Sequence, residues 1–161
     1  MYQILDIVKG TTVDGPGLRT SIYFAGCSHH CKGCQNPQSW DPANGYPMSL
    51  DELMQVIEEE DFDVTLSGGD PLLEPEKMSL LIKAIKKKGR NIWIYTGYVW
   101  EEIMGNELLL NAIKEADVLV DGRFIENLRD TDLRFRGSSN QRVIDIPKSL
   151  KTGGISLISF D

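Results

Sequence analysis

The chain has 161 residues, of which 41% are hydrophobic and 25% charged, a composition that predicts one folded domain over residues 1–161. Its formal net charge of -7 argues against nucleic acid as a main partner, because neutralising phosphates requires a basic surface. No apolar run approaches the roughly 20 residues of a membrane-spanning helix, and no segment resembles a secretory signal peptide, so we expect a cytoplasmic protein without a membrane partner.

Strand-like runs recur along the chain. They are rich in β-branched and aromatic residues and are bounded by glycine, proline or other turn formers. The predicted strands cover residues 18–24, 63–66, 91–95, 117–120, 142–146 and 155–159.

Helical patterns lie between these runs. Ser49 and Glu52 form a capping box, so a helix is predicted from there to about Glu60. A second helix is predicted over about residues 75–88, and a third stretch over residues 100–116 is predicted to break near Gly105 and Asn106. This alternation predicts an α/β fold with a mainly parallel sheet, either open or curled. Of the two we expect the curled form, a partial (β/α) barrel.

The three cysteines form one motif, Cys27-x3-Cys31-x2-Cys34, directly after the first predicted strand. Three thiolates without a fourth cysteine predict an iron-sulfur cluster whose fourth iron is left for a non-protein ligand. Disulfides are disfavoured, because the number of cysteines is odd. Zinc held with His29 or His30 stays open as an alternative, although structural zinc sites usually draw ligand pairs from separate turns. We favour the interpretation that both histidines lie over the cluster or beside its ligands and do not bind metal themselves.

Polar loops follow the next predicted strands. Gly68 and Gly69 would let backbone groups approach a ligand, and Asp70 could hold an ammonium group. Asp121 could accept hydrogen bonds from ribose hydroxyls, and Arg123 could pair with a carboxylate. Each loop alone would also suit an ordinary turn after a buried strand. Because carboxyl ends of parallel strands meet at one edge, we expect one site there.

Together these motifs resemble the radical S-adenosylmethionine enzymes, and within them the activating enzymes of the anaerobic (class III) ribonucleoside-triphosphate reductases. Gly33, where most radical enzymes of this class carry an aromatic residue, and Asp70, where many carry glutamate, are typical of this narrower group. The resemblance covers about residues 10 to 145 and rests on Asp14-Gly-Pro-Gly-Leu-Arg19, Gly26-Cys-Ser-His-His-Cys-Lys-Gly-Cys-Gln-Asn36 through Trp40, Ser67-Gly-Gly-Asp-Pro-Leu72, Asp117-Val-Leu-Val-Asp-Gly-Arg-Phe124 and Arg136-Gly-Ser-Ser-Asn-Gln141.

The resemblance implies a 4Fe-4S cluster with S-adenosylmethionine chelating its unique iron. The cluster would split the cofactor after accepting one electron from a donor such as a flavodoxin. The resulting 5'-deoxyadenosyl radical would take hydrogen from a glycine of the reductase, with no catalytic side chain beyond the cluster and cofactor. The implied cluster ligands are Cys27, Cys31 and Cys34, and the implied cofactor contacts come from Gly33, Cys34, Gln35, Gly68, Gly69, Asp70, Asp121 and Arg123.

Other functions remain open at this point. The chain could activate a different glycyl-radical enzyme of the pyruvate formate-lyase type, or act on a small molecule as deazaguanine synthases do. A zinc or electron-transfer module is the alternative outside enzymology. If the partner is a reductase, its glycine must be delivered to the cofactor, and the rigid turn from Asp14 to Arg19 is our candidate for part of that opening.

Overall fold

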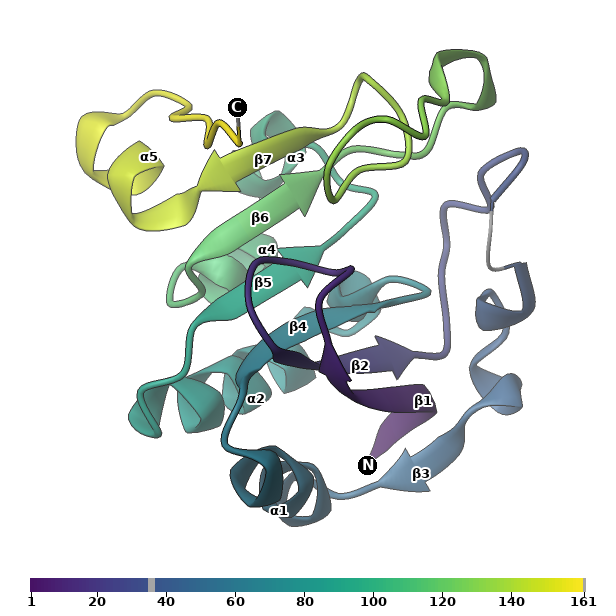
Figure 1. Ribbon diagram of the computed structural model, residues 1–161, viewed down its shortest axis with the longest axis vertical. Helices are drawn as coiled ribbons and strands as arrows, with labels where there is room; N and C mark the ends of the chain where they lie inside the picture. The colour runs from purple at the N-terminus through teal and green to yellow at the C-terminus, as the bar shows by residue number, and fades with distance from the viewer. Residues whose placement is uncertain (35–36, 161) are drawn as a thin grey trace.

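The computed structural model describes residues 1–34 and 37–160. These residues form one seven-stranded sheet with four helices packed on one face and a fifth helix near one edge. The central strands β2, β4, β5 and β6 run parallel, whereas β1, β3 and β7 are antiparallel to their neighbours (Figure 1). From edge to edge the order is β3 (Tyr46–Met48), β1 (Tyr2–Thr11), β2 (Arg19–Phe24), β4 (Asp63–Gly68), β5 (Ile92–Tyr95), β6 (Val118–Asp121) and β7 (Arg142–Asp145).

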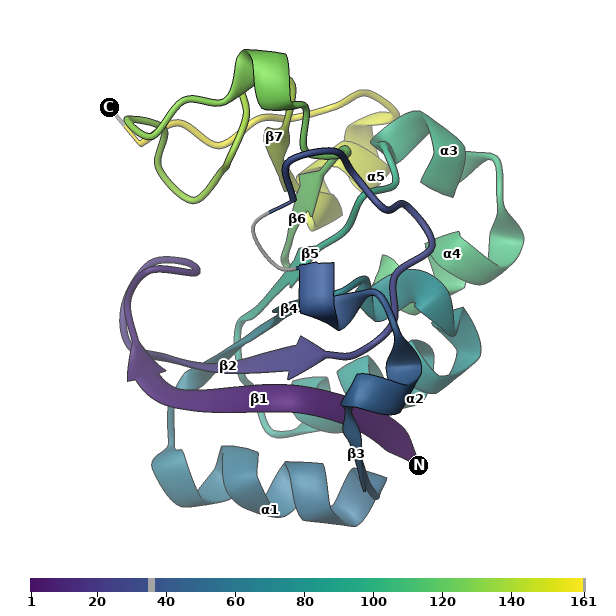
Figure 2. The same cartoon turned by 90° about the vertical axis from the view of Figure 1, so that its right-hand side faces the viewer.

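The α/β prediction is therefore confirmed, but the sheet is mixed and only its centre is parallel. The sheet is open, because β3 and β7 each have a neighbour on one side only. The curl into a partial barrel stays a prediction. What matters for the site is that the carboxyl ends of β2, β4, β5 and β6 share one edge of the sheet (Figure 2).

The predicted helices are confirmed. Ser49 and Glu52 form the expected capping box at the start of α1, and the Asn106 side chain accepts hydrogen bonds from two backbone N–H groups where the third stretch breaks. None of the helices among the described residues is long and apolar enough to cross a membrane. The bounds are α1 (Leu50–Glu60), α2 (Pro75–Lys87), α3 (Trp100–Met104), α4 (Glu107–Ile113) and α5 (Ile146–Thr152).

Two predictions at the ends of the chain were wrong. The first strand, β1, was missed, because it carries Asp6, Lys9 and Gly10 on its exposed half and only its beginning is buried. The predicted strand over residues 155–159 forms only an isolated bridge between Ile144 and Leu157. Helix α5 lies between β7 and this segment, because it begins at Ile146 and ends at Thr152.

Two hydrophobic clusters lie on opposite faces of the sheet. Helices α1 to α4 pack their apolar side chains against strand residues such as Ile22, Leu66 and Ile94 on one face. On the other face Trp93 and Val120 contact a smaller cluster that includes Phe135 and Phe160. Figure 2 shows the β1–β2 connection and the segment after β6 on this second side, across the sheet from α2, α3 and α4.

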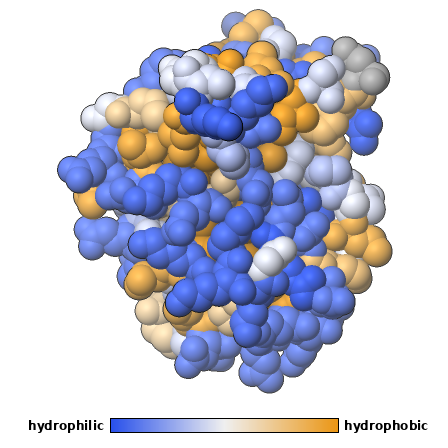
Figure 3. Space-filling view, turned by 90° about the vertical axis from the view of Figure 1, so that its left-hand side faces the viewer, coloured by the Kyte–Doolittle hydropathy of each residue, from blue (hydrophilic) through white to orange (hydrophobic). Residues whose placement is uncertain are grey.

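The side where the parallel strands begin is predominantly hydrophilic across its middle (Figure 3). On this side of the molecule, ion pairs connect the C-terminal end of α2 to neighbouring elements. Lys86 at the end of α2 pairs with Asp117 before β6 at 2.6 Å, and Lys88 pairs with Glu58 of α1 at 2.7 Å. The loops with the candidate functional residues leave the sheet at the opposite edge.

Candidate functional site

A cavity of about 180 Å³ lies at the carboxyl ends of the parallel strands. Each of the four loops that follow β2, β4, β5 and β6 contributes to its lining. The predicted convergence of these loops is therefore present in the structure. Of the predicted site residues, the lining includes Cys27, Cys31, Cys34, Gly68, Gly69 and Arg123.

The cysteine loop is hydrogen-bonded back onto the sheet. Gly26 N donates to Ser39 O at 2.6 Å, and Cys27 N donates to Trp40 O at 3.0 Å, so the loop returns close to its starting point. Asp70 N donates to Gly26 O at 2.8 Å. The loop after β2 is thus attached directly to the turn after β4.

All three cysteines are partly buried, and none forms a disulfide. Burial raises the pKa of the Cys27 and Cys31 thiols, so their thiolate forms would need a nearby cation. Within the described residues no three potential ligand side chains already stand in a metal-binding group. The three thiols share a cavity, and their common ligation of a cluster stays a prediction.

The cavity wall contains a buried polar atom that lacks a partner. Trp40 lines the cavity, and its indole Nε1 is buried with no hydrogen-bond acceptor among the described residues. A buried donor without a partner costs about 1–3 kcal/mol. The donor set that fits a cluster is the three soft thiols, which line the same cavity.

Gly68 and Gly69 line the cavity, but close packing of the protein itself already requires both glycines. A Cβ on Gly68 would lie 2.2 Å from Phe24 N, and one on Gly69 would lie 2.3 Å from Gly26 O. Gly68 also has a φ of 104°, which other residues rarely adopt. Side chains at these positions would push the β2 and β4 loops apart before they reached any ligand.

Asp70 was predicted to hold an ammonium group, but it is 3% exposed and is not in the lining of the cysteine cavity. Its carboxylate accepts hydrogen bonds from Leu72 N at 2.8 Å, Thr96 Oγ1 at 2.9 Å and Gly97 N at 2.9 Å. His29 Nε2 lies 2.7 Å from the same carboxylate. These four partners come from the segments that follow β2, β4 and β5. The predicted contact between Asp70 and an ammonium group therefore has no geometric support.

Asp121 likewise faces protein groups. It is completely buried, and its carboxylate accepts hydrogen bonds from Trp100 N at 2.8 Å and from Arg142 Nη2 at 2.6 Å. The carboxylate therefore fixes the start of α3 and the edge strand β7. Its predicted contact with ribose hydroxyls also lacks geometric support.

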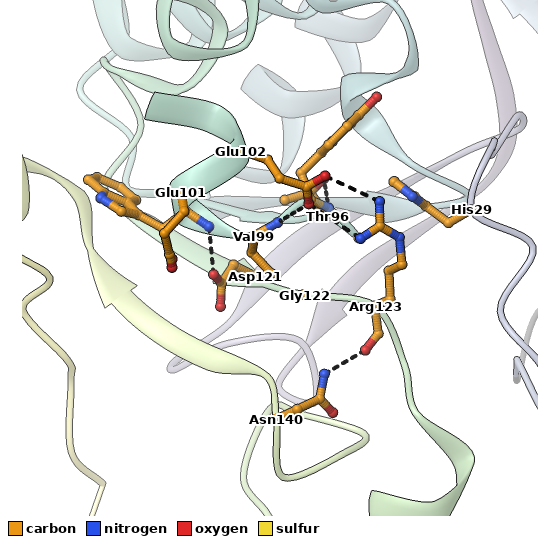
Figure 4. Close-up of polar contacts among 12 residues, drawn as sticks. His29, Thr96, Val99, Glu101, Glu102, Asp121, Gly122, Arg123 and Asn140 are labelled. Atoms are coloured by element: carbon orange, nitrogen blue, oxygen red, sulfur yellow. Dashed lines mark hydrogen bonds and ion pairs between the residues drawn. The ribbon is translucent and has the colours of Figure 1, made fainter. Parts of the chain in front are cut away.

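Arg123 does line the cavity, and its guanidinium pairs with Glu102 at 3.3 Å (Figure 4). The hydrogen bond from Val99 N and the neighbouring Arg123 hold the pKa of Glu102 below its usual value. The Asn140 side chain donates to Arg123 O at 2.8 Å. Arg123 is thus held at the cavity with its guanidinium still partly exposed.

The remaining predicted contacts lie elsewhere. Gly33 is exposed and absent from the lining, and a Cβ there would meet the Glu126 side chain at 3.0 Å. Gln35 lies outside the described residues. Trp40 ends the cysteine motif of the resemblance but was not predicted to contact the cofactor, and neither was Gln141 of the Arg136-to-Gln141 motif. Its Oε1 accepts from Gly137 N at 2.9 Å, and its Nε2 donates to Gly122 O at 2.9 Å.

Comparison with known proteins agrees with this geometry. Residues 13–144 match a family described as a 4Fe-4S single cluster domain. Three similar proteins carry the name anaerobic ribonucleoside-triphosphate reductase-activating protein. The protein of Escherichia coli strain K12 is 35% identical over 142 residues, covering 81% of this chain and 90% of its own. Those of Enterobacteria phage T4 and Vibrio cholerae are 35% and 33% identical, covering 81% and 80% of this chain and 86% and 88% of their own.

Proposed function

This chain belongs to the family of anaerobic ribonucleoside-triphosphate reductase-activating proteins, and on that premise we propose that it activates such a reductase by radical S-adenosylmethionine chemistry. The observation that carries the proposal is the convergence of all three cysteines on one cavity at the carboxyl ends of parallel strands. Residues 1–161 would act as one domain, supplied with electrons by a donor such as a flavodoxin.

Cys27, Cys31 and Cys34 would hold a 4Fe-4S cluster through their thiolates. When bound, the cluster and S-adenosylmethionine would supply reductive cleavage of the cofactor and a radical that takes hydrogen from a glycine of the reductase. The work of the protein is to bind, orient and shield these groups. Three thiols from one loop leave room for a ligand that is not part of the chain.

The cavity walls would orient S-adenosylmethionine. The backbones of Gly68 and Gly69 line one side and offer polar groups without side chains in the way. Arg123 lines the other side of the cavity. Its guanidinium could bind a carboxylate of the cofactor in place of its partly exposed ion pair with Glu102.

Anaerobic reconstitution with iron and sulfide tests the cofactor part of this proposal. We expect a protein that contains iron and sulfide, binds S-adenosylmethionine and cleaves it to methionine and 5'-deoxyadenosine under reduction. A colourless protein that retains zinc instead would support a zinc module. A protein with a cluster that leaves S-adenosylmethionine intact would be an electron-transfer module. Activation of a pyruvate formate-lyase type enzyme, but not of the reductase, would assign a different partner.

A further inference from the structure

The wall of the cysteine cavity contains one permanent positive charge. Among the described residues that line it, Arg123 is the only lysine or arginine, and no aspartate or glutamate is present. Arg123 follows β6, and hydrogen bonds fix the backbone around it. Asn140 donates to Arg123 O at 2.8 Å, and Gln141 donates to Gly122 O at 2.9 Å. A carboxylate that enters this cavity therefore has one guanidinium with which to pair.

This guanidinium is already paired with a carboxylate from outside the lining. Glu102 lies on α3 and is not part of the cavity wall, but its two carboxylate oxygens face both terminal nitrogens of Arg123. Nη1 donates to Oε1 at 3.3 Å, and Nη2 donates to Oε2 at 3.4 Å. Figure 4 shows the two side chains pointing toward one another. Glu102 thus occupies the two nitrogens that would bind a ligand carboxylate in the same way.

Glu102 is held in this position by a second contact that does not depend on Arg123. Its Oε1 also accepts a hydrogen bond from Val99 N at 3.0 Å, directly before the first turn of α3. This hydrogen bond and the charge of Arg123 hold the pKa of Glu102 below its usual value, so the side chain is a carboxylate at neutral pH. If Arg123 turned to a ligand, Glu102 would stay beside it and would still be charged.

The pair is weak enough to exchange for a ligand. The side chains of Arg123 and Glu102 are 44% and 40% exposed, and water screens an ion pair of this kind. Both N–O distances are longer than the roughly 2.7–2.9 Å of a strong charge-assisted hydrogen bond. Neither side chain forms another ion pair within the described part of the chain. A ligand carboxylate with better geometry would therefore displace Glu102 at a small but measurable cost.

We propose that Glu102 competes with the carboxylate of S-adenosylmethionine for Arg123 and thereby lowers the affinity of the cavity for the amino-acid end of the cofactor. The proposal rests on the function proposed above. Glu102 is not a catalytic residue, because it acts on the cofactor through Arg123 alone. It limits how tightly the cavity holds any ligand that presents this carboxylate.

The test measures binding of S-adenosylmethionine to cluster-loaded Glu102→Gln by calorimetry, with the cluster kept oxidised so that the cofactor stays intact. Glutamine keeps an oxygen for Val99 N and removes the charge that pairs with Arg123. The Kd should fall about two- to fivefold, as expected when an exposed ion pair no longer competes. Glu101→Gln is the matched control, because it removes the adjacent charge on α3, whose partner Arg142 lies outside the cavity lining. It should match wild type.

The direction of the change separates competition from general electrostatics. S-adenosylmethionine carries a positive sulfonium, so losing a nearby negative charge would weaken its binding if Glu102 acted only through its field. S-adenosylhomocysteine has the same carboxylate without the sulfonium charge, and its Kd should fall by the same factor. In Arg123→Gln protein both ligands should bind more weakly than to wild type, and adding Glu102→Gln should bring no gain.

Unchanged or weaker binding of both ligands to Glu102→Gln would overturn the competition and leave the proposed function intact. An equal gain in Glu101→Gln, or a gain that persists in Arg123→Gln protein, would also overturn it, because the effect would then not act through Arg123. If cluster-loaded wild type binds no S-adenosylmethionine, the proposed function itself fails.

Discussion

His29 Nε2 lies 2.7 Å from a carboxylate oxygen of Asp70, and this contact joins the cysteine loop to the turn after β4. Both side chains are almost fully buried. Gly97 N donates to the same oxygen of Asp70, and a Cβ on Gly97 would lie 2.4 Å from the His29 ring. The pair therefore fixes the chain between Cys27 and Cys31 against two strand ends.

We predict that Asp70→Asn loosens the cysteine loop, because an amide cannot accept from all the donors that surround this carboxylate. Hydrogen bonds to a charged group are worth about 1.5–3 kcal/mol each, so iron should be lost to a chelator at least several-fold faster. Iron release monitored by absorbance measures this. Asp41→Asn is the control, since Asp41 caps a short exposed helix through Ala43 N. Equal release rates in the two variants would show that Asp70 does not position the loop.

Each of Cys27→Ala, Cys31→Ala and Cys34→Ala should lose the cluster, because two protein thiolates remain to hold it. Iron and sulfide analysis after reconstitution measures the loss. His30→Ala serves as the control within the same loop, since His30 stacks on Trp40 at 4.6 Å and should be dispensable for iron. Full iron content in any one cysteine variant, or loss of metal in the histidine variant, contradicts the ligand assignment.

Gly69→Ala should destabilise the fold by about 3 kcal/mol, at the upper end of the usual cost of overpacking. The physical reason is the 2.3 Å distance from the new Cβ to Gly26 O. Urea unfolding measures the change. Gly154→Ala, whose Cβ would meet nothing within 4 Å, should be close to neutral. If both variants are equally stable, the glycine at position 69 is required by a ligand rather than by packing.

Stability at acid pH should report on Glu102. Its pKa is lowered by the Val99 N–H and by Arg123, so its contribution to stability is present above the unfolded pKa near 4.5 and is lost as pH falls through the lower folded value. Glu102→Gln should therefore lower the melting temperature slightly at pH 7 and not at pH 3. The effect should be small, because this pair is partly exposed. Glu76→Gln on α2 is the control, and an identical pH profile for both variants would be inconsistent with the prediction.

Local signals were sufficient for the helices and for the gathering of the loops. Ser49 with Glu52, and Asn106 after Gly105, mark helix ends through contacts a few residues apart. The strand β1 escaped prediction because four of its ten residues, Asp6, Val8, Lys9 and Gly10, are exposed. Its register shifts further blur the alternation on which strand prediction depends.

The directions of the acidic side chains could not be predicted. Spacing placed Asp70 and Asp121 at the carboxyl ends of two parallel strands, β4 and β6, which is correct. Their partners, however, come from distant segments: His29 for Asp70, and Arg142 for Asp121. A carboxylate at a strand end suits a ligand or a distant loop equally well in the sequence, and only the three-dimensional arrangement decides between them.

Electron paramagnetic resonance on a mixture of the reduced, cluster-loaded protein, S-adenosylmethionine and the anaerobic reductase tests most directly whether this protein activates the reductase. We predict a glycyl-radical signal that appears on the reductase together with 5'-deoxyadenosine, and that is absent with Cys31→Ala. Cleavage of S-adenosylmethionine without any glycyl radical on the reductase, or a radical that forms without the three cysteines, would contradict it.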